Sequence, residues 1–320
     1  RWSFDTDNRE PMPPDHRLPP APQAARTANA RDVTSMVNRE FSTHPGCADG
    51  LWLPTNRAGA LHWLDDFLTE RLEGFGTYED AITTRSATVH HGVLSPLLNS
   101  GLLTPQEVIN RALEHDAPLN DLEGFLRQMV GWREFIRGIY RRHGACMRSR
   151  NVWDANRRLA PSWLNATTGI APLDHAVGTA INLGWNHHIE RLMVIANLMN
   201  LCEIAPQDVY RFFMTHYVDA YDWVMVPNVF GMGLTSDGGI FATKPYICGS
   251  NYLRKMGDHP KGDWSTVVDG LFWRFVLRHR DRLAKNPRVS VMASAAKRMS
   301  PKRRKLLLTA ADHFLKEHTQ

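Results

Sequence analysis

The sequence predicts an all-α protein, and three observations favour that class. Apolar side chains recur at helical spacing from about residue 56 onward, long β-branched alternation is nearly absent, and prolines gather near the N-terminus. A chain of 320 residues can also bury a large core. We therefore expect an extended proline-rich arm over residues 1–55 and one helical domain over residues 56–320.

The proposed arm is the least regular part of the chain. Its prolines are too dense for a helix interior and favour extended geometry: Pro11, Pro13, Pro14, Pro19, Pro20 and Pro22. Residues 32–41 could form one short helix before the loop at Pro45-Gly46. We expect the remainder to act as a linker along the surface of a folded body.

Helical signals then follow in order. Residues 58–71 carry Leu61, Leu64 and Phe67 at helical spacing. Thr104 followed by Pro105 is a typical helix start, with threonine as the cap and proline at the first position. The next predicted helix, residues 122–141, should bury one face made of Phe125, Met129, Trp132, Phe135 and Ile136. Further helices are expected over residues 176–201, 206–223, 266–285 and 301–317.

Composition excludes several classes of protein. Hydrophobic residues make up 43% and charged residues 22% of the chain, which is ordinary for a globular protein. No apolar run reaches the roughly 18 residues that a membrane span needs. The four cysteines form no CxxC pair, so they indicate reduced, mostly buried thiols rather than disulfides. A net charge of +5 permits a nucleic-acid partner without requiring one.

Basic residues cluster over residues 297–305. Such a cluster beside a helix start is usually a solvated face, and that is the first expectation. The alternative is binding of phosphate or of an acidic partner.

Six short motifs carry information that periodicity does not. They are YEDA at 78–81, HGVLSPLLN at 91–99, WREF at 132–135, WNHHIERLM at 185–193, PNVFGM at 227–232 and SDGGIFATKPY at 236–246. Together they resemble the flavin domain of the bacterial (6-4) photolyase and cryptochrome branch. The resemblance covers almost the whole chain. It implies the helical, FAD-binding C-terminal domain of that family, and residues 2–9 resemble the end of the linker that follows the family's antenna domain. We therefore expect that this chain lacks the antenna domain.

The resemblance also implies an FAD site. The serine of motif 91–99 and nearby backbone amides would hold the flavin diphosphate, which suits an anion at a helix start. Gly92 and Val93 stand where serine and arginine are common in the family, and this should weaken the diphosphate site. Asp237 would contact the flavin, and the two glycines after it would allow a close backbone approach. The implied cofactor-binding residues are Ser95, Leu97, Asn99, Asn228, Met232 and Asp237.

The catalytic residues implied by the resemblance are His187, His188 and Tyr246. One histidine of the pair would transfer a proton during repair, which suits an imidazole that titrates near neutral pH. Neighbouring helical residues diverge by about 100°, so the pair makes a poor metal chelate. Trp132 and Met232 would shape the pocket for a flipped-out DNA lesion.

The chain departs from the family pattern in two places. Cysteine ligands of an iron–sulfur cluster should lie near Pro172 and within residues 259–265, but neither place has a cysteine. We therefore expect no iron–sulfur cluster and no other metal. The tryptophan and tyrosine relay that photoreduces the flavin should include positions 212 and 213, which are Phe212 and Phe213, and a third near Leu164. Trp153, Trp185 or Trp223 could substitute, although core packing explains most tryptophans.

Three functions remain open from the sequence. The first is a light-driven DNA lyase that transfers an electron from reduced FAD to a pyrimidine photoproduct, with damaged DNA as its partner. The second is a non-catalytic subunit of a larger complex, held through the N-terminal arm and the basic C-terminal segment, in an organelle such as a chloroplast or mitochondrion. The third is a cryptochrome-like light sensor, which the phenylalanine pair disfavours because sensing needs photoreduction.

Overall fold

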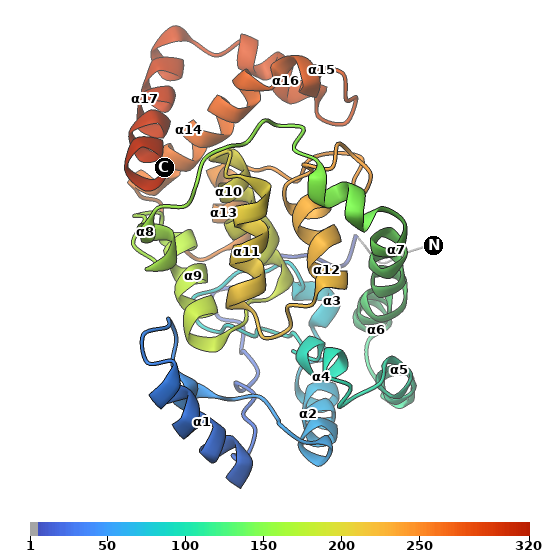
Figure 1. The fold of residues 1–320 in the computed structure, drawn as a ribbon. Coiled ribbons are helices and arrows are strands. Elements are labelled where there is room, and N and C mark those ends of the chain that lie inside the picture. The colour runs from blue at the N-terminus through green and yellow to red at the C-terminus, as the bar shows by residue number, and fades with distance from the viewer. Residues whose placement is uncertain (1–5) are drawn as a thin grey trace. The chain divides into compact units, whose positions relative to one another are not determined.

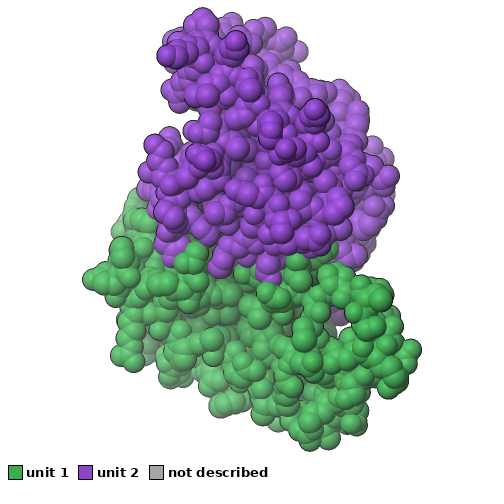
Figure 2. All heavy atoms as spheres, turned by 90° about the vertical axis from the view of Figure 1, so that its left-hand side faces the viewer, with its two compact units in different colours: residues 1–135, 179–189, 216–219 green, residues 136–178, 190–215, 220–320 purple. Residues whose placement is uncertain are grey.

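The computed structural model describes residues 6–320, and its contacts divide the chain into two compact units. Unit 1 comprises residues 1–135, 179–189 and 216–219, and unit 2 comprises residues 136–178, 190–215 and 220–320 (Figure 2). Over the described residues the structure contains helices and two isolated β-bridges but no strand, which confirms the all-α prediction (Figure 1). Within that part of the chain no helix is long and apolar enough to cross a membrane.

The elements follow one another as short to medium helices. Up to residue 132 they are α1 (Ala28–Glu40), the 3₁₀ turn η1 (Ala48–Gly50), α2 (Arg57–Glu70), α3 (Phe75–Tyr78), α4 (Ser95–Asn99), α5 (Pro105–Glu114), α6 (Leu119–Leu126) and the π-helix η2 (Arg127–Trp132). Up to residue 216 they are α7 (Arg133–Ser149), α8 (Pro161–Leu164), α9 (Ala171–Leu183), the π-helix η3 (Glu190–Ala196), α10 (Asn197–Leu201) and α11 (Pro206–His216). The rest are α12 (Asp222–Val226), the π-helix η4 (Pro227–Gly233), α13 (Ser250–Met256), α14 (Asp263–Arg278), α15 (Arg280–Ala284), α16 (Ser290–Lys297) and α17 (Pro301–His318).

Side-chain caps fix several helix starts where the sequence predicts them. Thr104 and Glu107 form a reciprocal capping box at the start of α5, with Pro105 in its first turn. Asn56 caps α2 by accepting a hydrogen bond from the amide of Gly59, and Ser300 caps α17 in the same way. These interactions satisfy backbone amides that have no partner inside the helix.

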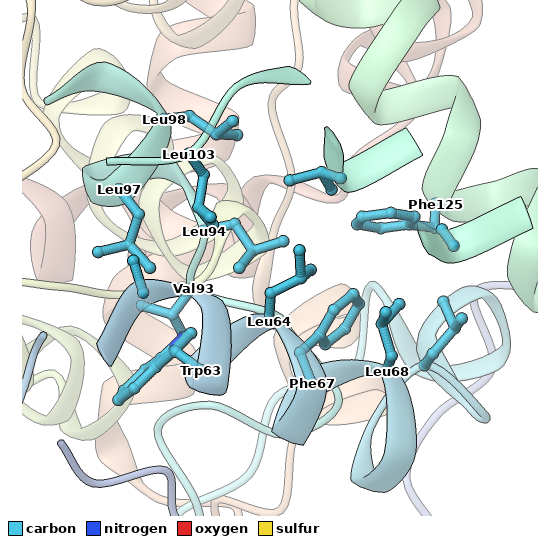
Figure 3. Packing of buried hydrophobic residues seen from close by; sticks show 14 of the residues in the cluster. Trp63, Leu64, Phe67, Leu68, Val93, Leu94, Leu97, Leu98, Leu103 and Phe125 are labelled. Atoms are coloured by element: carbon cyan, nitrogen blue, oxygen red, sulfur yellow. The ribbon is translucent and has the colours of Figure 1, made fainter. Parts of the chain in front are cut away.

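The core of unit 1 forms around the buried face of α2. Trp63, Leu64 and Phe67 of that helix pack with Leu97 of α4 and Phe125 of α6, as Figure 3 shows. Complete burial of one such side chain contributes about 1.5–3 kcal/mol. This core fixes the segment that leads into α4, which carries much of the candidate site.

Four predictions about helices differ from the structure. The segments 206–223 and 266–285 each contain two helices, because α11 ends before α12 begins and α14 ends before α15 begins. Residues 176–201 are not one helix, because α9 ends at Leu183 and η3 begins at Glu190. Gly184 has a φ of +62°, and a Cβ there would lie 2.8 Å from Cγ1 of Val218. The helix therefore breaks at a residue whose lack of a side chain allows both the left-handed backbone and the close approach. Phe135, predicted on a buried face, is 42% exposed.

The N-terminal arm belongs to unit 1, and residues 8–10 bind it to the rest of that unit. The amides of Arg9 and Glu10 donate to the carbonyls of Gly76 and Thr77, and Asn8 exchanges hydrogen bonds with Asn120. A helix, α1, interrupts it. The predicted linker motif at residues 2–9 lies partly outside the described residues. The predicted domain boundary near residue 55 stays a prediction.

Candidate functional site

The predicted site residues fall on both units. Unit 1 holds Ser95, Leu97, Asn99, Trp132, His187 and His188. Unit 2 holds Asn228, Met232, Asp237 and Tyr246. Each group is described within its own unit.

A strained loop precedes α4 in unit 1. Val89 and Val93 have φ values of +48° and +52°, a backbone region that β-branched residues rarely adopt. Gly92 lies between them in sequence, accepts a hydrogen bond from the indole of Trp63 at 2.9 Å, and would clash mildly with Phe67 if it carried a Cβ. Left-handed β-branched residues cost free energy and gather at functional sites, so the loop is a candidate binding element.

Ser95 and Asn99 of α4 meet at Asp219. The Ser95 hydroxyl donates to the Asp219 carboxylate at 2.6 Å, and the Asn99 amide donates to the Asp219 backbone carbonyl at 3.0 Å. Over the described residues the buried Oδ1 of Asn99 accepts no hydrogen bond. Leu97, by contrast, points into the core, so only its backbone could contact a ligand. A buried, unsatisfied amide oxygen beside a carboxylate suits a polar ligand with N–H or O–H groups.

The histidine pair is split between two environments. His187 is buried and stacks on His91, with ring centroids 4.9 Å apart and planes 8° apart, whereas His188 is exposed. The break at Gly184 brings the short segment of residues 185–187 into this position. Asn186 accepts a hydrogen bond from the Tyr217 hydroxyl at 2.7 Å and so anchors the segment.

In unit 2, Asp237 closes its own turn. Its two carboxylate oxygens accept the amides of Gly239 and Phe241, both at 2.9 Å. Burial raises the pKa of Asp237 above its ordinary value, against the opposing effect of these amides and of Arg150. These bonds shape the glycine turn, and a flavin contact by Asp237 stays a prediction.

π-Helices carry or adjoin several of the predicted residues. Asn228 and Met232 lie in η4, Trp132 lies in η2, and η3 begins two residues after His188. Such widened turns are frequent at functional sites. Within η4, Asn228 donates to the carbonyl of Val224 at 2.8 Å and Met232 is buried.

The other predicted pocket residues are aromatic. Tyr246 lies half-buried, with the Lys244 ammonium 5.9 Å from its ring centre. Trp132 is also half-buried and lies against Phe135, with ring centres 5.7 Å apart. Both rings are accessible enough to contact a ligand.

The positions of the usual electron relay are apolar and buried. Phe212 and Phe213 pack edge to face in the interior, with ring centres 5.7 Å apart. Trp163 and Trp153 are buried too, and each indole donates to a backbone carbonyl, of His318 and Leu234 respectively. Packing therefore accounts for these two tryptophans.

The cysteines are less buried than expected. Cys202 and Cys248 are buried, but Cys47 and Cys146 are exposed. Burial raises the pKa of Cys248 to about 12, so its thiol stays protonated. None of the four lies where the family's cluster ligands are expected.

Sequence reasoning missed three residues of unit 1. The sequence predicts no role for His91 or Asp219, because each contacts a residue that is distant in the sequence. Arg71 is a buried cation: among the residues that the structure describes, its Nε and Nη2 meet no acceptor, and burial lowers the pKa of its guanidinium. An arginine inside an apolar helix face is the only sequence signal for it.

Comparisons with known proteins agree with this geometry. Residues 1–52 match the family described as "Deoxyribodipyrimidine photo-lyase-related protein". The chain is 34% identical to the (6-4) photolyase of Agrobacterium fabrum over 331 aligned residues, which cover 99% of this chain and 65% of that relative. Together these similarities support a photolyase-related family for the chain.

Solved structures of the photolyase and cryptochrome group share the fold. A bacterial class III photolyase from Agrobacterium tumefaciens matches 92% of this chain and 60% of its own, with a TM-score of 0.55 and 21% identity. The cryptochrome of Synechocystis sp. PCC6803 matches 82% of this chain and 55% of its own, with a TM-score of 0.50 and 13% identity. The resemblance and the fold predicted from the sequence are therefore confirmed. This photolyase-related chain spans less than two thirds of these relatives.

Proposed function

We propose that the chain binds FAD and acts as a photolyase-like lyase on a pyrimidine photoproduct in DNA. The observation that carries the proposal is the 34% identity to a (6-4) photolyase along 99% of the chain. A (6-4) photoproduct is accordingly the lesion to test first. Bound FAD in its reduced form would supply, after absorbing blue light, the electron that starts repair.

The polar groups of unit 1 fit an FAD molecule. Asn99 offers an unsatisfied buried oxygen, and Ser95 and Asp219 offer a hydroxyl and a carboxylate beside it. The left-handed backbone at Val93 gives the loop before α4 a defined shape. Since α4 has only five residues, its helix dipole is small, and individual amides would have to hold the diphosphate.

The histidine stack suits control of a single proton. Protonation of His187 disfavours a second charge on His91, because two imidazolium rings at 4.9 Å repel each other. A proton can therefore be held on one ring of the pair and given to the lesion from His187. His188 is exposed and would contact the DNA or the lesion from the solvent side.

Lesion contacts are assigned to the aromatic and sulfur-containing residues. We propose that Tyr246 and Met232 of unit 2 contact the flipped base, as their motifs in the family suggest. The motif of Trp132 in unit 1 suggests a lesion contact as well, and this stays a separate prediction. Phe212 and Phe213 cannot relay electrons as tryptophan or tyrosine would, so reduction of the flavin should depend on an external reductant. The light-sensor function is weaker for the same reason. No iron–sulfur cluster is proposed, since its cysteines are absent.

An absorption spectrum of the purified native protein tests flavin binding first. Oxidised-flavin bands that bleach under blue light with a mild reductant are the expected result. A protein without flavin that co-purifies in a large particle would instead support the accessory-subunit alternative and contradict the enzyme.

Repair of an oligonucleotide with one (6-4) photoproduct then tests the histidines. His187→Asn should lower the repair rate about 10²–10⁴-fold, the usual contribution of a positioned proton donor. His313→Asn, an exposed histidine of α17, is the matched control and should leave the rate unchanged. Equal rates for the two variants, with flavin bound in both, would exclude His187 as the proton donor.

A further inference from the structure

A cavity lies within unit 2 beside the turn of Gly238 and Gly239, and none of the six predicted cofactor-binding residues lines it. Its volume is about 370 Å³, and its lining includes Trp153, Thr235, Gly238, Lys244 and Arg282. Two of these side chains are cationic, and no aspartate or glutamate lines the cavity. Three acids adjoin lining residues in the sequence: Asp237 is fully buried with its carboxylate bonded to its own turn, and Asp154 and Asp281 are exposed. The cavity is therefore electropositive.

Thr235 lines this cavity and has a buried hydroxyl without a hydrogen-bond partner among the described residues. The residue also has a φ of +50°, a strained conformation for a β-branched side chain. The backbone holds it there, since the Thr235 amide donates to Gly231 and its carbonyl accepts from Gly238. A buried hydroxyl without a partner costs free energy unless a ligand satisfies it.

The cations of the cavity are held in place by their neighbours. The Arg282 guanidinium lies 5.7 Å from the centre of the Trp153 ring, a cation–π contact. Asn286 donates to the Thr243 carbonyl at 2.8 Å and so ties the end of α15 to the loop that carries Lys244. An anion with several oxygens could bind both cations and the hydroxyl of Thr235.

The cationic character continues along the chain from this cavity. Residues 278–305 contain eleven lysines and arginines and a single acid, Asp281, which gives 11 − 1 = +10, whereas the whole chain carries +5. These residues belong to the end of α14, to α15 and α16, and to the start of α17, which pack together in unit 2 (Figure 1). Glu203 pairs with Arg278, and Asp281 pairs with Arg280.

Four cationic side chains lie at the N-terminal end of α17, where positive charge does not stabilise a helix. Lys302, Arg303, Arg304 and Lys305 follow one another there, and the first turn contains no acid. Cations at a helix N-terminus oppose the helix dipole by about 0.3–1 kcal/mol each. All four residues are exposed. Helix stability therefore does not explain this cluster, whereas a polyanionic partner does.

We propose that Lys244, Arg282 and Thr235 form a phosphate site, and that the bound phosphate belongs to a nucleic-acid backbone that continues along the cationic segment 278–305. The partner is a phosphodiester chain recognised without regard to base or lesion. Free inorganic phosphate shares the chemistry of one such group but cannot reach the rest of the segment. Binding of undamaged nucleic acid in the dark needs neither flavin nor lesion, so it can succeed or fail independently of repair.

The test is the affinity of the full chain for an undamaged, labelled DNA duplex, measured in the dark by fluorescence anisotropy at several salt concentrations. Lys244→Gln combined with Arg282→Gln should raise Kd at least about tenfold at 0.1 M salt and lower the salt slope by about 2. Lys255→Gln combined with Lys261→Gln removes the same charge from exposed positions of unit 2 and should change Kd less than about twofold.

A hydroxyl swap tests the cavity itself. Thr235→Ala should raise Kd about fivefold, while Thr235→Ser keeps the hydroxyl and should bind like the parent. Neutralising Lys302, Arg303 and Arg304 to glutamine should weaken binding but raise the melting temperature, a combination that a purely structural role would not give.

Three results would overturn the proposal. The first is equal weakening of binding by the two double variants, which would show attraction by net charge alone. The second is no binding of the duplex by the parent at physiological salt. The third is binding of inorganic phosphate that depends on Lys244 and Arg282 together with a duplex affinity that does not, which would show a site for a small phosphate instead.

Discussion

Two charged regions of unit 2 differ in how their charges are compensated. Around Glu203 every charge has an opposite partner: its carboxylate, 2% exposed, binds Arg274 at 2.7 Å, Arg278 at 2.9 Å and His279 at 3.0 Å. In the cavity beside Arg282, by contrast, two cations and a buried hydroxyl face no carboxylate of the described lining. We infer that charged side chains with an opposite partner stabilise the fold, whereas charged side chains without one indicate a binding site for a ligand.

The pKa values agree with this difference. Burial alone would raise the pKa of Glu203, but the hydrogen bonds from His279 and Arg274 and the charge of Arg278 outweigh it and hold the pKa below its ordinary value. Since the folded state binds its proton less readily than the unfolded chain, this stability is present above about pH 4.5 and is lost as the pH falls below it.

Removing the carboxylate should break the compensated region. Glu203→Gln leaves three cationic or protonatable side chains without their shared anion, so the free energy of unfolding should fall by about 3–5 kcal/mol. The free energy of unfolding is measured by chemical denaturation, with circular dichroism as the signal. Asp312→Asn removes the exposed second partner of Arg274 and should cost less than about 1 kcal/mol. Similar losses in the two variants would mean that Glu203 is not the centre of the cluster.

Arg71 extends the comparison to unit 1, because its guanidinium is buried and, among the described residues, only the nearby charges of Asp66 and Glu70 oppose the cost of that burial. Replacing it with methionine keeps much of the apolar stem and removes the guanidinium whose Nε and Nη2 find no acceptor within the described residues. The free energy of unfolding should rise by about 1–3 kcal/mol in the flavin-free protein. Arg111→Met is the control, since Arg111 pairs with Asp65 at the surface at 2.6 Å, and should change little. A destabilised Arg71→Met would reveal an anion bound to Arg71 in solution.

Local signals made most helices predictable from the sequence. The cap and proline at residues 104 and 105 gave the start of α5, and Pro301 gave the start of α17, because the interactions that set these ends lie within one turn. The break after Leu183 was missed, since its cause is the close packing of Val218 on Gly184. The π-helices were missed as well, because their widened turns leave no clear mark in apolar spacing.

The sequence predicted individual residues of the candidate site but not the contacts between them. Family resemblance pointed to His187 and Ser95, but not to His91 and Asp219, which they contact. Ser95 and Asp219 are 124 residues apart, so no periodicity or spacing joins them. Thr235 and Arg71 became candidates only when burial and hydrogen bonding were known, since an unsatisfied atom is a property of the folded chain.

The smallest effect expected concerns a pair of neutral imidazoles that join the arm to the loop before α4. Nε2 of His16 lies 3.0 Å from Nε2 of His90, so one ring must donate and the other accept. Burial lowers the pKa of both below the ordinary value of 6.5, and Arg85 adds to the effect at His16. The unfolded chain therefore takes up protons first as the pH falls, and stability is lost below about pH 6.5.

Replacing His16 with phenylalanine keeps a ring beside Tyr78 and removes one of the two titrating groups. The loss of stability as the pH falls from 7 to 5.5 should become shallower than in the parent. The measurement is the free energy of unfolding across that range. His62→Phe, an exposed histidine of α2, should keep the slope of the parent. If both variants keep that slope, the His16–His90 hydrogen bond between neutral imidazoles does not hold the arm in place.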